Sequence, residues 1–157
     1  MPDNLFPVGY EEQELAEDDL VEEKAIGYLN GPAFDDEVGD FMRDGSNRIL
    51  DSDGIASWKS WCINCIQTER YKHLAYDSDF GIETEAAMRA ETREEAESIL
   101  TRQITEAIMA DPYGRAEYLE QLDFSWTAPD AVEITAVIHG IDDVTIDITA
   151  YITKGEV

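Results

Sequence analysis

Residues 131–153, AVEITAVIHGIDDVTIDITAYIT, decide the fold. Apolar residues recur at every second position in two runs, and threonine and acidic residues fill most of the positions between them. This period of two is typical of strands that bury one face and leave the other in water. Gly140-Ile141-Asp142-Asp143 separates the two runs as a turn. The stretch therefore predicts two antiparallel strands of a sheet with one dry face.

A third strand precedes these two. The residues from Leu122 to Trp126 alternate in the same way, and Pro129-Asp130 marks a turn before the next run. We therefore expect a C-terminal, three-stranded antiparallel meander. Its dry face consists of Leu122, Phe124, Trp126, Val132, Ile134, Ala136, Ile138, Val144, Ile146, Ile148, Ala150 and Ile152.

Two helices are expected before the meander. Ser52 or Asp53 can cap a helix that begins near Ile55. Thr92-Arg93-Glu94-Glu95 matches a capping box, and Asp111-Pro112 ends the helix that follows it. Apolar residues recur at helical spacing in both segments and predict two buried faces. These faces are Ile55, Trp58, Cys62, Cys65 and Ile66 in the first helix, and Ala96, Ile99, Leu100, Gln103, Ile104, Ala107 and Ile108 in the second.

Residues 40–50, DFMRDGSNRIL, place turn-forming residues between two short β-capable runs. A hairpin is therefore expected there. Strands at both ends of the chain and helices between them predict an α+β fold. We expect helices packed on one face of a small, mostly antiparallel sheet, with an N-terminal hairpin and the C-terminal meander.

The net charge of the chain limits its partners. Its 36 acidic residues against 11 lysines and arginines give a net charge of −25. Phosphate binding needs cationic side chains, so we expect no nucleic acid partner. Anionic membranes would repel the same surface, and no apolar run is long enough to span a bilayer. The N-terminus lacks the basic start and apolar run of a signal peptide, which favours a cytoplasmic protein.

The acidic residues are dense near the N-terminus. We predict that residues 1–32 form an acidic arm that is mobile or ordered by a partner, and that residues 33–157 form one α+β domain. A solubilising tail is the plain interpretation of the arm. Its apolar residues Leu5, Phe6, Val8 and Tyr10 also suit a short docking motif.

The motifs that suggest chemistry are weak. Cys62 and Cys65 form a single CxxC on the apolar face of a helix, which favours core packing over a metal site or a redox pair. His73 lacks a nucleophile motif beside it and is expected in a half-buried extended segment. His139 falls on the polar face of a strand and is expected to be exposed. We therefore predict no catalytic residue, no metal site and no cofactor.

An acidic cell-wall glycosidase is the alternative function. The carboxylates between residues 77 and 85 could include an acid and a nucleophile, as in lysozyme-like enzymes. That chemistry requires one desolvated carboxyl group with a raised pKa. The charge of the chain also suits a polyanionic wall substrate badly. A further alternative is an acidic adaptor or decoy that binds basic proteins.

Residues 68–83, TERYKHLAYDSDFGIE, are expected to form a rigid corner. Gly81 suits a tight turn, and Arg70 is expected to end the first helix and to pair with a buried or interfacial carboxylate. Aromatic side chains would lock the corner while charged groups point outward. As a surface for another protein, it would present Arg70, Tyr71, Tyr76, Phe80, Gly81 and Glu83.

Three segments together resemble a known family. They are residues 54–83 (GIASWKSWCINCIQTERYKHLAYDSDFGIE), residues 100–113 (LTRQITEAIMADPY) and residues 122–140 (LDFSWTAPDAVEITAVIHG). Their order and spacing resemble the baseplate wedge, or tail-sheath initiator, family of contractile-tailed phages, including the branch found in Bacillus prophages. Relatives occur in contractile secretion and tailocin machines. The resemblance covers about residues 40 to 153.

The resemblance implies a structural baseplate protein rather than an enzyme. It implies a six-fold ring in the tail baseplate of a virion or a tail-like particle, assembled in the cytoplasm of a bacterial host. The implied partners are the tail sheath protein and other baseplate wedge proteins, with the central hub or tube as a further candidate. The implied role is to join wedge components and to template the first ring of the sheath.

The last strand offers a second candidate interface. It comes last in the chain, and its run VTIDITAYIT (residues 144–153) has no proline, glycine or lysine to block an exposed edge. The resemblance supplies a partner, because sheath subunits are held together by exchanged strands. We therefore expect this sheet to accept or donate a strand. The residues of this second surface are Val144, Ile146, Ile148 and Ile152.

Overall fold

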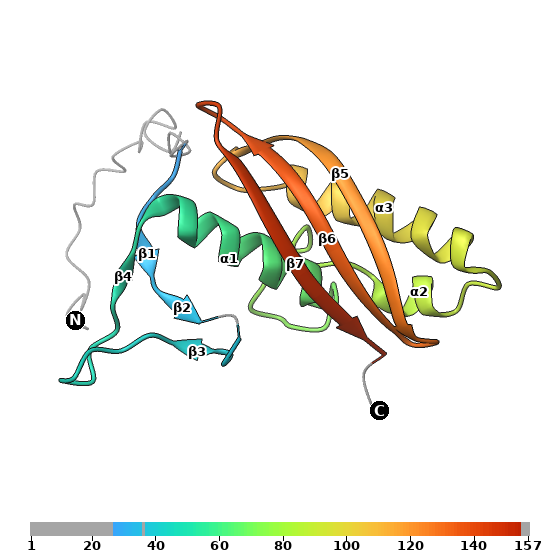
Figure 1. Cartoon of the computed structure of the whole chain (residues 1–157), viewed down its shortest axis with the longest axis horizontal. Helices are drawn as coiled ribbons and strands as arrows, with labels where there is room; N and C mark the ends of the chain where they lie inside the picture. Colours follow the sequence, from blue (N-terminus) through green and yellow to red (C-terminus); the bar gives the residue numbers. More distant parts are fainter. Residues whose placement is uncertain (1–26, 36, 155–157) are drawn as a thin grey trace, which may run out of the picture.

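The computed structural model describes residues 27–35 and 37–154 of the chain (Figure 1). The predicted α+β class is confirmed, with short N-terminal strands and a C-terminal meander. The elements, in chain order, are β1 (Gly31–Pro32), β2 (Phe34–Asp35), β3 (Asp40–Phe41), β4 (Asp51–Ser52), α1 (Gly54–Gln67), α2 (Thr84–Met88), α3 (Arg93–Met109), β5 (Ala116–Ala128), β6 (Ala131–Gly140) and β7 (Thr145–Thr153).

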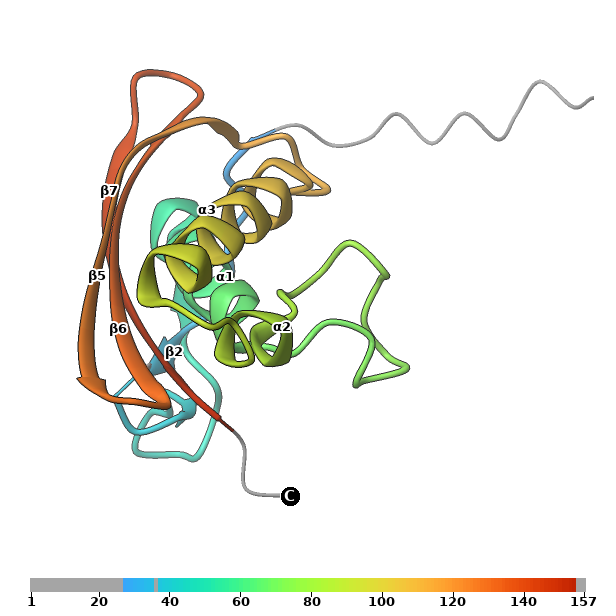
Figure 2. The ribbon, with the colours of Figure 1, turned by 90° about the vertical axis from the view of Figure 1, so that its right-hand side faces the viewer.

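The three long strands form an antiparallel sheet in the order β5-β6-β7. Residues of neighbouring strands pair directly, so that Ile134 of β6 lies between Phe124 of β5 and Ala150 of β7. Every second residue of β6 and β7 is buried, as the period of two predicted. Figure 2 shows the helices on one face of the sheet only, so the opposite face meets the solvent.

Capping side chains define where the two long helices begin. The Asp53 carboxylate accepts a hydrogen bond from the Ala56 amide at 2.9 Å at the start of α1. The Thr92 hydroxyl accepts one from the Glu95 amide at 3.2 Å at the start of α3. Both predicted caps are confirmed. The Glu95 carboxylate accepts from the Glu91 amide rather than from that of Thr92, so the reciprocal half of the box is shifted by one residue.

The core lies between the helices and the inner face of the sheet. Trp58 and both cysteines of α1, the apolar stripe of α3, and the inward residues of β6 and β7 form one buried cluster. Each large apolar side chain that is fully buried contributes about 1.5–3 kcal/mol to folding. The predicted faces of both helices and of the sheet are therefore the ones that the fold buries, except that Ile55 is exposed near the start of α1.

The predicted N-terminal turn forms, but the strands on its two sides do not pair with each other as a simple hairpin would. Residues 44–47 make the predicted turn, in which the Asn47 amide donates to the Asp44 carbonyl at 3.0 Å. Only Arg43 and Ile49 bridge across this turn. The flanking strands pair outward instead, β3 with β2 and β4 with β1. β1 and β2 were not predicted, because each is two residues long and shows no periodic pattern.

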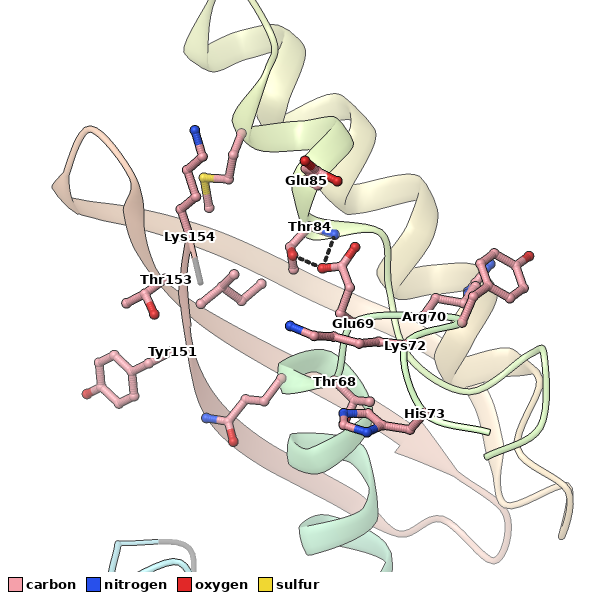
Figure 3. A pocket seen from close by; sticks show the side chains of 14 residues that line it. Thr68, Glu69, Arg70, Lys72, His73, Thr84, Glu85, Tyr151, Thr153 and Lys154 are labelled. Atoms are coloured by element: carbon pink, nitrogen blue, oxygen red, sulfur yellow. Dashed lines mark hydrogen bonds between the residues drawn. The ribbon is translucent and has the colours of Figure 1, made fainter. Parts of the chain in front are cut away.

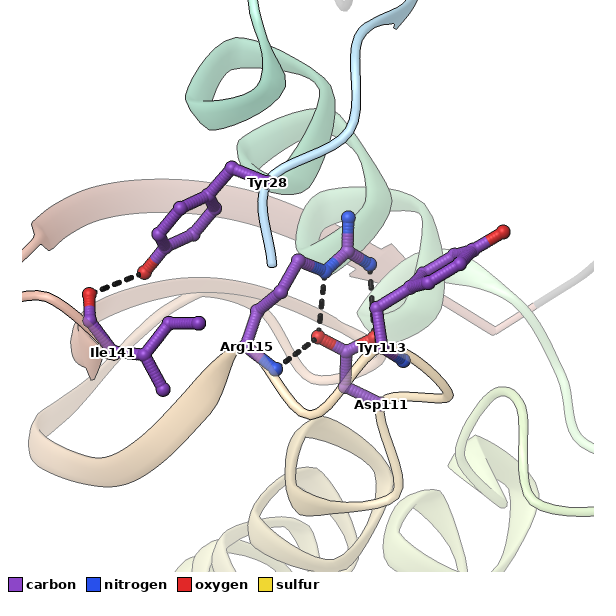
Figure 4. Close-up of polar contacts among 5 residues, drawn as sticks. All are labelled: Tyr28, Asp111, Tyr113, Arg115 and Ile141. Atoms are coloured by element: carbon purple, nitrogen blue, oxygen red, sulfur yellow. Dashed lines mark hydrogen bonds and ion pairs between the residues drawn. The ribbon is translucent and has the colours of Figure 1, made fainter. Parts of the chain in front are cut away.

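A buried ion pair fastens the end of α3 to the sheet (Figure 4). The Arg115 guanidinium donates to both carboxylate oxygens of Asp111, at 2.7 and 2.9 Å. The same carboxylate accepts the backbone amides of Tyr113 and Arg115, each at 3.1 Å. Arg115 also lies over the rings of Trp61 and Tyr113. Its carbonyl accepts the Ile141 amide at 2.9 Å, so the network reaches the turn between β6 and β7.

Tyr28 closes the same end of the domain. Its ring packs on Trp58 with 5.3 Å between the ring centroids, and its hydroxyl donates to the Ile141 carbonyl at 2.9 Å. Burial, together with the nearby carboxylate of Asp142, raises the pKa of this hydroxyl and keeps it a donor. Within the arm predicted over residues 1–32, the structure describes residues 27–32, and these pack on the domain; residues 1–26 lie outside the described part.

Candidate protein interface

The base of the corner at residues 68–83 is pinned by backbone hydrogen bonds. The Arg70 amide donates to the Ile82 carbonyl at 2.9 Å, and the Ile82 amide donates to the Thr68 carbonyl at 3.0 Å. Gly81 has a φ of +91°, and a Cβ there would lie 2.6 Å from the Thr68 carbonyl oxygen. Only glycine fits such a position without strain. The prediction of a tight turn at Gly81 is therefore confirmed.

Arg70 does not have its predicted partner. Its Nε donates to the Gly81 carbonyl at 2.9 Å, and no carboxylate among the described residues lies within ion-pair distance. A buried carboxylate partner is therefore absent from the described residues, and the Gly81 carbonyl takes its place; an interfacial carboxylate stays a prediction. Arg70 also lies beyond the end of α1, at Gln67, so it does not end that helix. Its side chain instead clamps the two ends of the loop.

The loop itself projects into solvent. It runs between α1 and α2 through tight turns and stands away from the helices in Figure 2. His73 and Leu74 are exposed, and so are Tyr71 and Tyr76. The prediction of a half-buried extended segment around His73 is therefore wrong. Successive turns, such as Tyr76 amide to His73 carbonyl at 3.2 Å, keep the segment too far from the core to be covered.

Aromatic contacts hold the far end of the loop. Phe80 packs against Trp61 at 5.7 Å and against Tyr76 at 4.7 Å between ring centroids. Beyond it, the Glu83 amide donates to the Gln103 side chain of α3 at 2.9 Å. The corner is therefore anchored by Phe80, Gly81 and Glu83, while Tyr71 and the outer side of Tyr76 are exposed.

The strand β7 lies at an edge of the sheet, as predicted. The side chains of Ile146, Ile148 and Ile152 are buried beneath the helices, and Val144 packs against the same core. Ile146 and Ile148 are therefore closed to a partner, whereas Val144 is only partly buried and Ile152 reaches the edge of a groove. The candidate interface on this strand is therefore its backbone.

The register shows which backbone groups face outward. The Gly140 amide donates to the Val144 carbonyl and the Lys154 amide to the Asp130 carbonyl, so the even-numbered residues of β7 bond to β6. Groups alternate along an antiparallel strand, so the odd-numbered residues direct their amides and carbonyls away from β6. No described strand pairs with them. These residues are Thr145, Asp147, Thr149, Tyr151 and Thr153.

The two edges of the sheet differ. The β5–β6 pairing has three register shifts, between Ala116 and Tyr118, Leu119 and Gln121, and Trp126 and Ala128. Bulges of this kind twist an edge and hinder the addition of another strand. The β6–β7 pairing is regular throughout. The edge suited to another chain is therefore that of β7.

A groove of about 710 Å³ joins parts of the two predicted surfaces (Figure 3). Arg70 and Tyr71 line it from the corner, and Ile152 lines it from β7. Glu69 is held within it by the backbone amide of Thr84 at 3.1 Å and by the Thr84 hydroxyl. Tyr76 lines a separate groove, whereas Phe80, Gly81, Glu83, Val144, Ile146 and Ile148 line neither.

Cys62 and Cys65 lie in the core as free thiols, which confirms their predicted packing. Burial raises the pKa of Cys62 well above its usual range and that of Cys65 to about 11. The described residues contain no cluster of three potential metal ligands. His139, expected to be exposed, is partly covered because it stacks on Tyr118 at 4.5 Å and bonds to Thr145 at 3.1 Å.

A fixed, exposed loop and an open strand edge are the features of this fold that suit a small structural protein. The family model described as contractile injection system sheath initiator matches residues 32–143, and the chain belongs to that family. The family predicted from the sequence is thus confirmed. No curated protein matches the chain. None of the described helices is long and apolar enough to cross a membrane.

Family membership gives the chain a structural role in a contractile injection system, as a component of the tail or baseplate that interacts with the sheath.

Proposed function

We propose that this chain joins wedge components of the baseplate and templates the first ring of the sheath, and that the edge of β7 accepts a strand from the first sheath subunit. The open, regular edge of β7 is the observation that supports this role. Added strands gain affinity from main-chain hydrogen bonds, and β7 offers unpaired groups at every second residue. The sheath protein is then the direct partner of this strand.

The corner is proposed as the contact for other wedge proteins, and the central hub or tube is a further candidate. Its exposed Tyr71 and Tyr76 are of the type enriched in protein interfaces. The proposed setting is a six-fold ring in the tail baseplate of a virion or related particle, assembled in the cytoplasm of the bacterial host. No nucleic acid or membrane is a proposed partner.

The proposed role is not enzymatic. The glycosidase alternative needs a desolvated carboxyl group, but Asp77, Asp79 and Glu85 are exposed and Glu83 is only half-buried. Glu85 also pairs with Arg89. A turbidity assay on purified cell walls checks this point, because lysis by the protein would favour the enzyme.

The strand-addition step is tested by proline at one outward position. Thr149→Pro removes an amide that points away from β6, so it disables the edge while sparing the β6–β7 hydrogen bonds. Thr149→Ala keeps the amide and is the matched control. Ile148→Pro is less informative because the Ile148 amide faces β6.

We expect baseplates with Thr149→Pro to assemble without sheath, while circular dichroism shows a folded protein and Thr149→Ala starts sheath normally. Sheath of normal length on folded Thr149→Pro baseplates would refute strand addition at β7.

A further inference from the structure

A second groove, of about 350 Å³, lies where the N-terminal strands, α1 and the corner meet. The strand segment contributes Pro32, Phe34 and Phe41, α1 contributes Trp61, and the corner contributes Tyr76. All of its lining residues are uncharged, in a chain of which 30% of the residues are charged. The groove is therefore an aromatic, neutral site on a strongly acidic protein.

The walls of this aromatic groove are held in place. Phe34 and Phe41 meet edge to face at 5.4 Å between ring centroids. Trp61 packs on Phe80, and the guanidinium of Arg115 lies 5.4 Å from its ring centroid. Since Asp111 fixes Arg115 in turn, the Trp61 wall of the groove is held in place by the core of the domain. Preformed sites lose less conformational freedom on binding.

The strand segment beside the groove, residues 37–50, is covered by few of the described residues. Every residue from 37 to 50 is exposed. Isolated two-stranded hairpins are marginally stable in water, and apolar patches of this kind usually meet a partner. The exposed apolar residues of this segment are Val38, Phe41, Met42, Ile49 and Leu50.

The chain carries a segment of matching chemistry. Residues 4–10, Asn-Leu-Phe-Pro-Val-Gly-Tyr, are uncharged and mostly apolar, whereas acidic residues dominate positions 11–23. A proline flanked by apolar residues suits an aromatic groove, because such grooves recognise stiff, proline-containing segments. The groove and this segment are thus both neutral and both apolar.

Chain length allows the two to meet within one molecule. The described chain begins at Gly27 and reaches the groove at Pro32. Residues 11–26 can span roughly 50 Å when extended, at about 3.3 Å per residue. A tether of this length gives a high effective concentration, which favours the segment over a separate partner.

We propose that residues 4–10 of this chain dock in the aromatic groove of the same molecule. Phe6 and Val8 enter between Phe34, Phe41 and Trp61, and the acidic stretch 11–23 forms the tether. The docked segment covers the groove side of the N-terminal strands.

Hydrogen exchange on the full-length protein tests the docking. The double variant Phe6→Ser/Val8→Ser should lose protection at residues 31–41, while the matched control Leu20→Ser, in the tether, should keep it. A peptide of residues 1–12, added to the double variant, should restore the protection. Phe34→Ala in the groove should lower the affinity for that peptide by roughly tenfold, since a buried aromatic contact is lost.

Equal exchange in the wild type and the double variant would overturn the proposal, as would a peptide that fails to bind. Sedimentation that shows a dimer in the wild type and a monomer in the double variant would also overturn it, because the segment would then occupy the groove of a second copy.

Discussion

Asp111→Ala should be among the most destabilising substitutions in the domain. The carboxylate of Asp111 is the partner of a guanidinium that is almost completely buried, and both side chains are shielded from water. Removing one member of a buried ion pair costs about 3–5 kcal/mol, because the other charge is left uncompensated. The variant also deprives the amides of Tyr113 and Arg115 of their acceptor. Since small domains are stable by about 5–15 kcal/mol, this loss consumes much of the total.

A double-mutant cycle separates the ion pair from the rest of the network. In Arg115→Met the carboxylate keeps its two backbone donors, so we expect a smaller loss than in Asp111→Ala. The double variant Asp111→Ala/Arg115→Met should be more stable than the single Asp111→Ala, because no unpaired cation remains.

Urea denaturation followed by circular dichroism measures all four free energies of unfolding. A loss below about 1 kcal/mol for Asp111→Ala would refute the reasoning, since it would mean that water reaches the guanidinium. A double variant less stable than Asp111→Ala would refute it as well.

Three further predictions follow from single sites. Gly140→Ala should destabilise the domain by about 1–3 kcal/mol in urea denaturation, because the new Cβ would clash with the Tyr28 hydroxyl and would lie 2.6 Å from the Trp58 ring and 2.8 Å from the Arg115 carbonyl oxygen. Unchanged stability would contradict this close packing around Gly140. Burial raises the pKa of the Cys65 thiol from 9.0 to about 11 in the folded protein, so the stabilisation that comes from this shift is complete below pH 9 and is lost as the pH rises to about 11. The free energy of unfolding should therefore fall less steeply across this pH range in Cys65→Ala than in the wild type. Equal slopes in the two proteins would count against a buried thiol. Arg70→Ala should lower the free energy of unfolding by roughly 1 kcal/mol, because the hydrogen bond to the Gly81 carbonyl is lost. The variant should stay folded by circular dichroism but should be incorporated poorly into baseplates. Normal incorporation would show that the corner is not part of the interface.

The candidate interface could be predicted from the sequence only in part. The corner and the last strand were recognised from turn residues, aromatic composition and an unblocked strand. The side chains of Ile146, Ile148 and Ile152 are buried and that of Val144 is partly buried, so the groups that face outward are mainly the backbone groups of the intervening residues. The alternation itself contained this signal, because the apolar positions that define the core cannot also face a partner.

The aromatic groove was not predicted. Its walls come from three segments that are far apart in the sequence, at residues 32–41, 57–64 and 76. No periodic pattern links them. The apolar residues Leu5, Phe6, Val8 and Tyr10 were expected to suit a short docking motif, but the groove that we propose for this segment forms only when those three segments are brought together.

The sequence by itself determined the local features of this protein. A period of two set the strands and their dry face, and Asp53 and Thr92 set the starts of the long helices. These features depend on neighbouring residues alone, since side-chain direction and capping act within a few positions. Tertiary structure alone decided which charges are buried, those of Asp111 and Arg115, and which carbonyl Arg70 binds. It also decided that β7 has an open edge. The reason is that desolvation depends on what packs on a group from distant parts of the chain, and no local spacing records it.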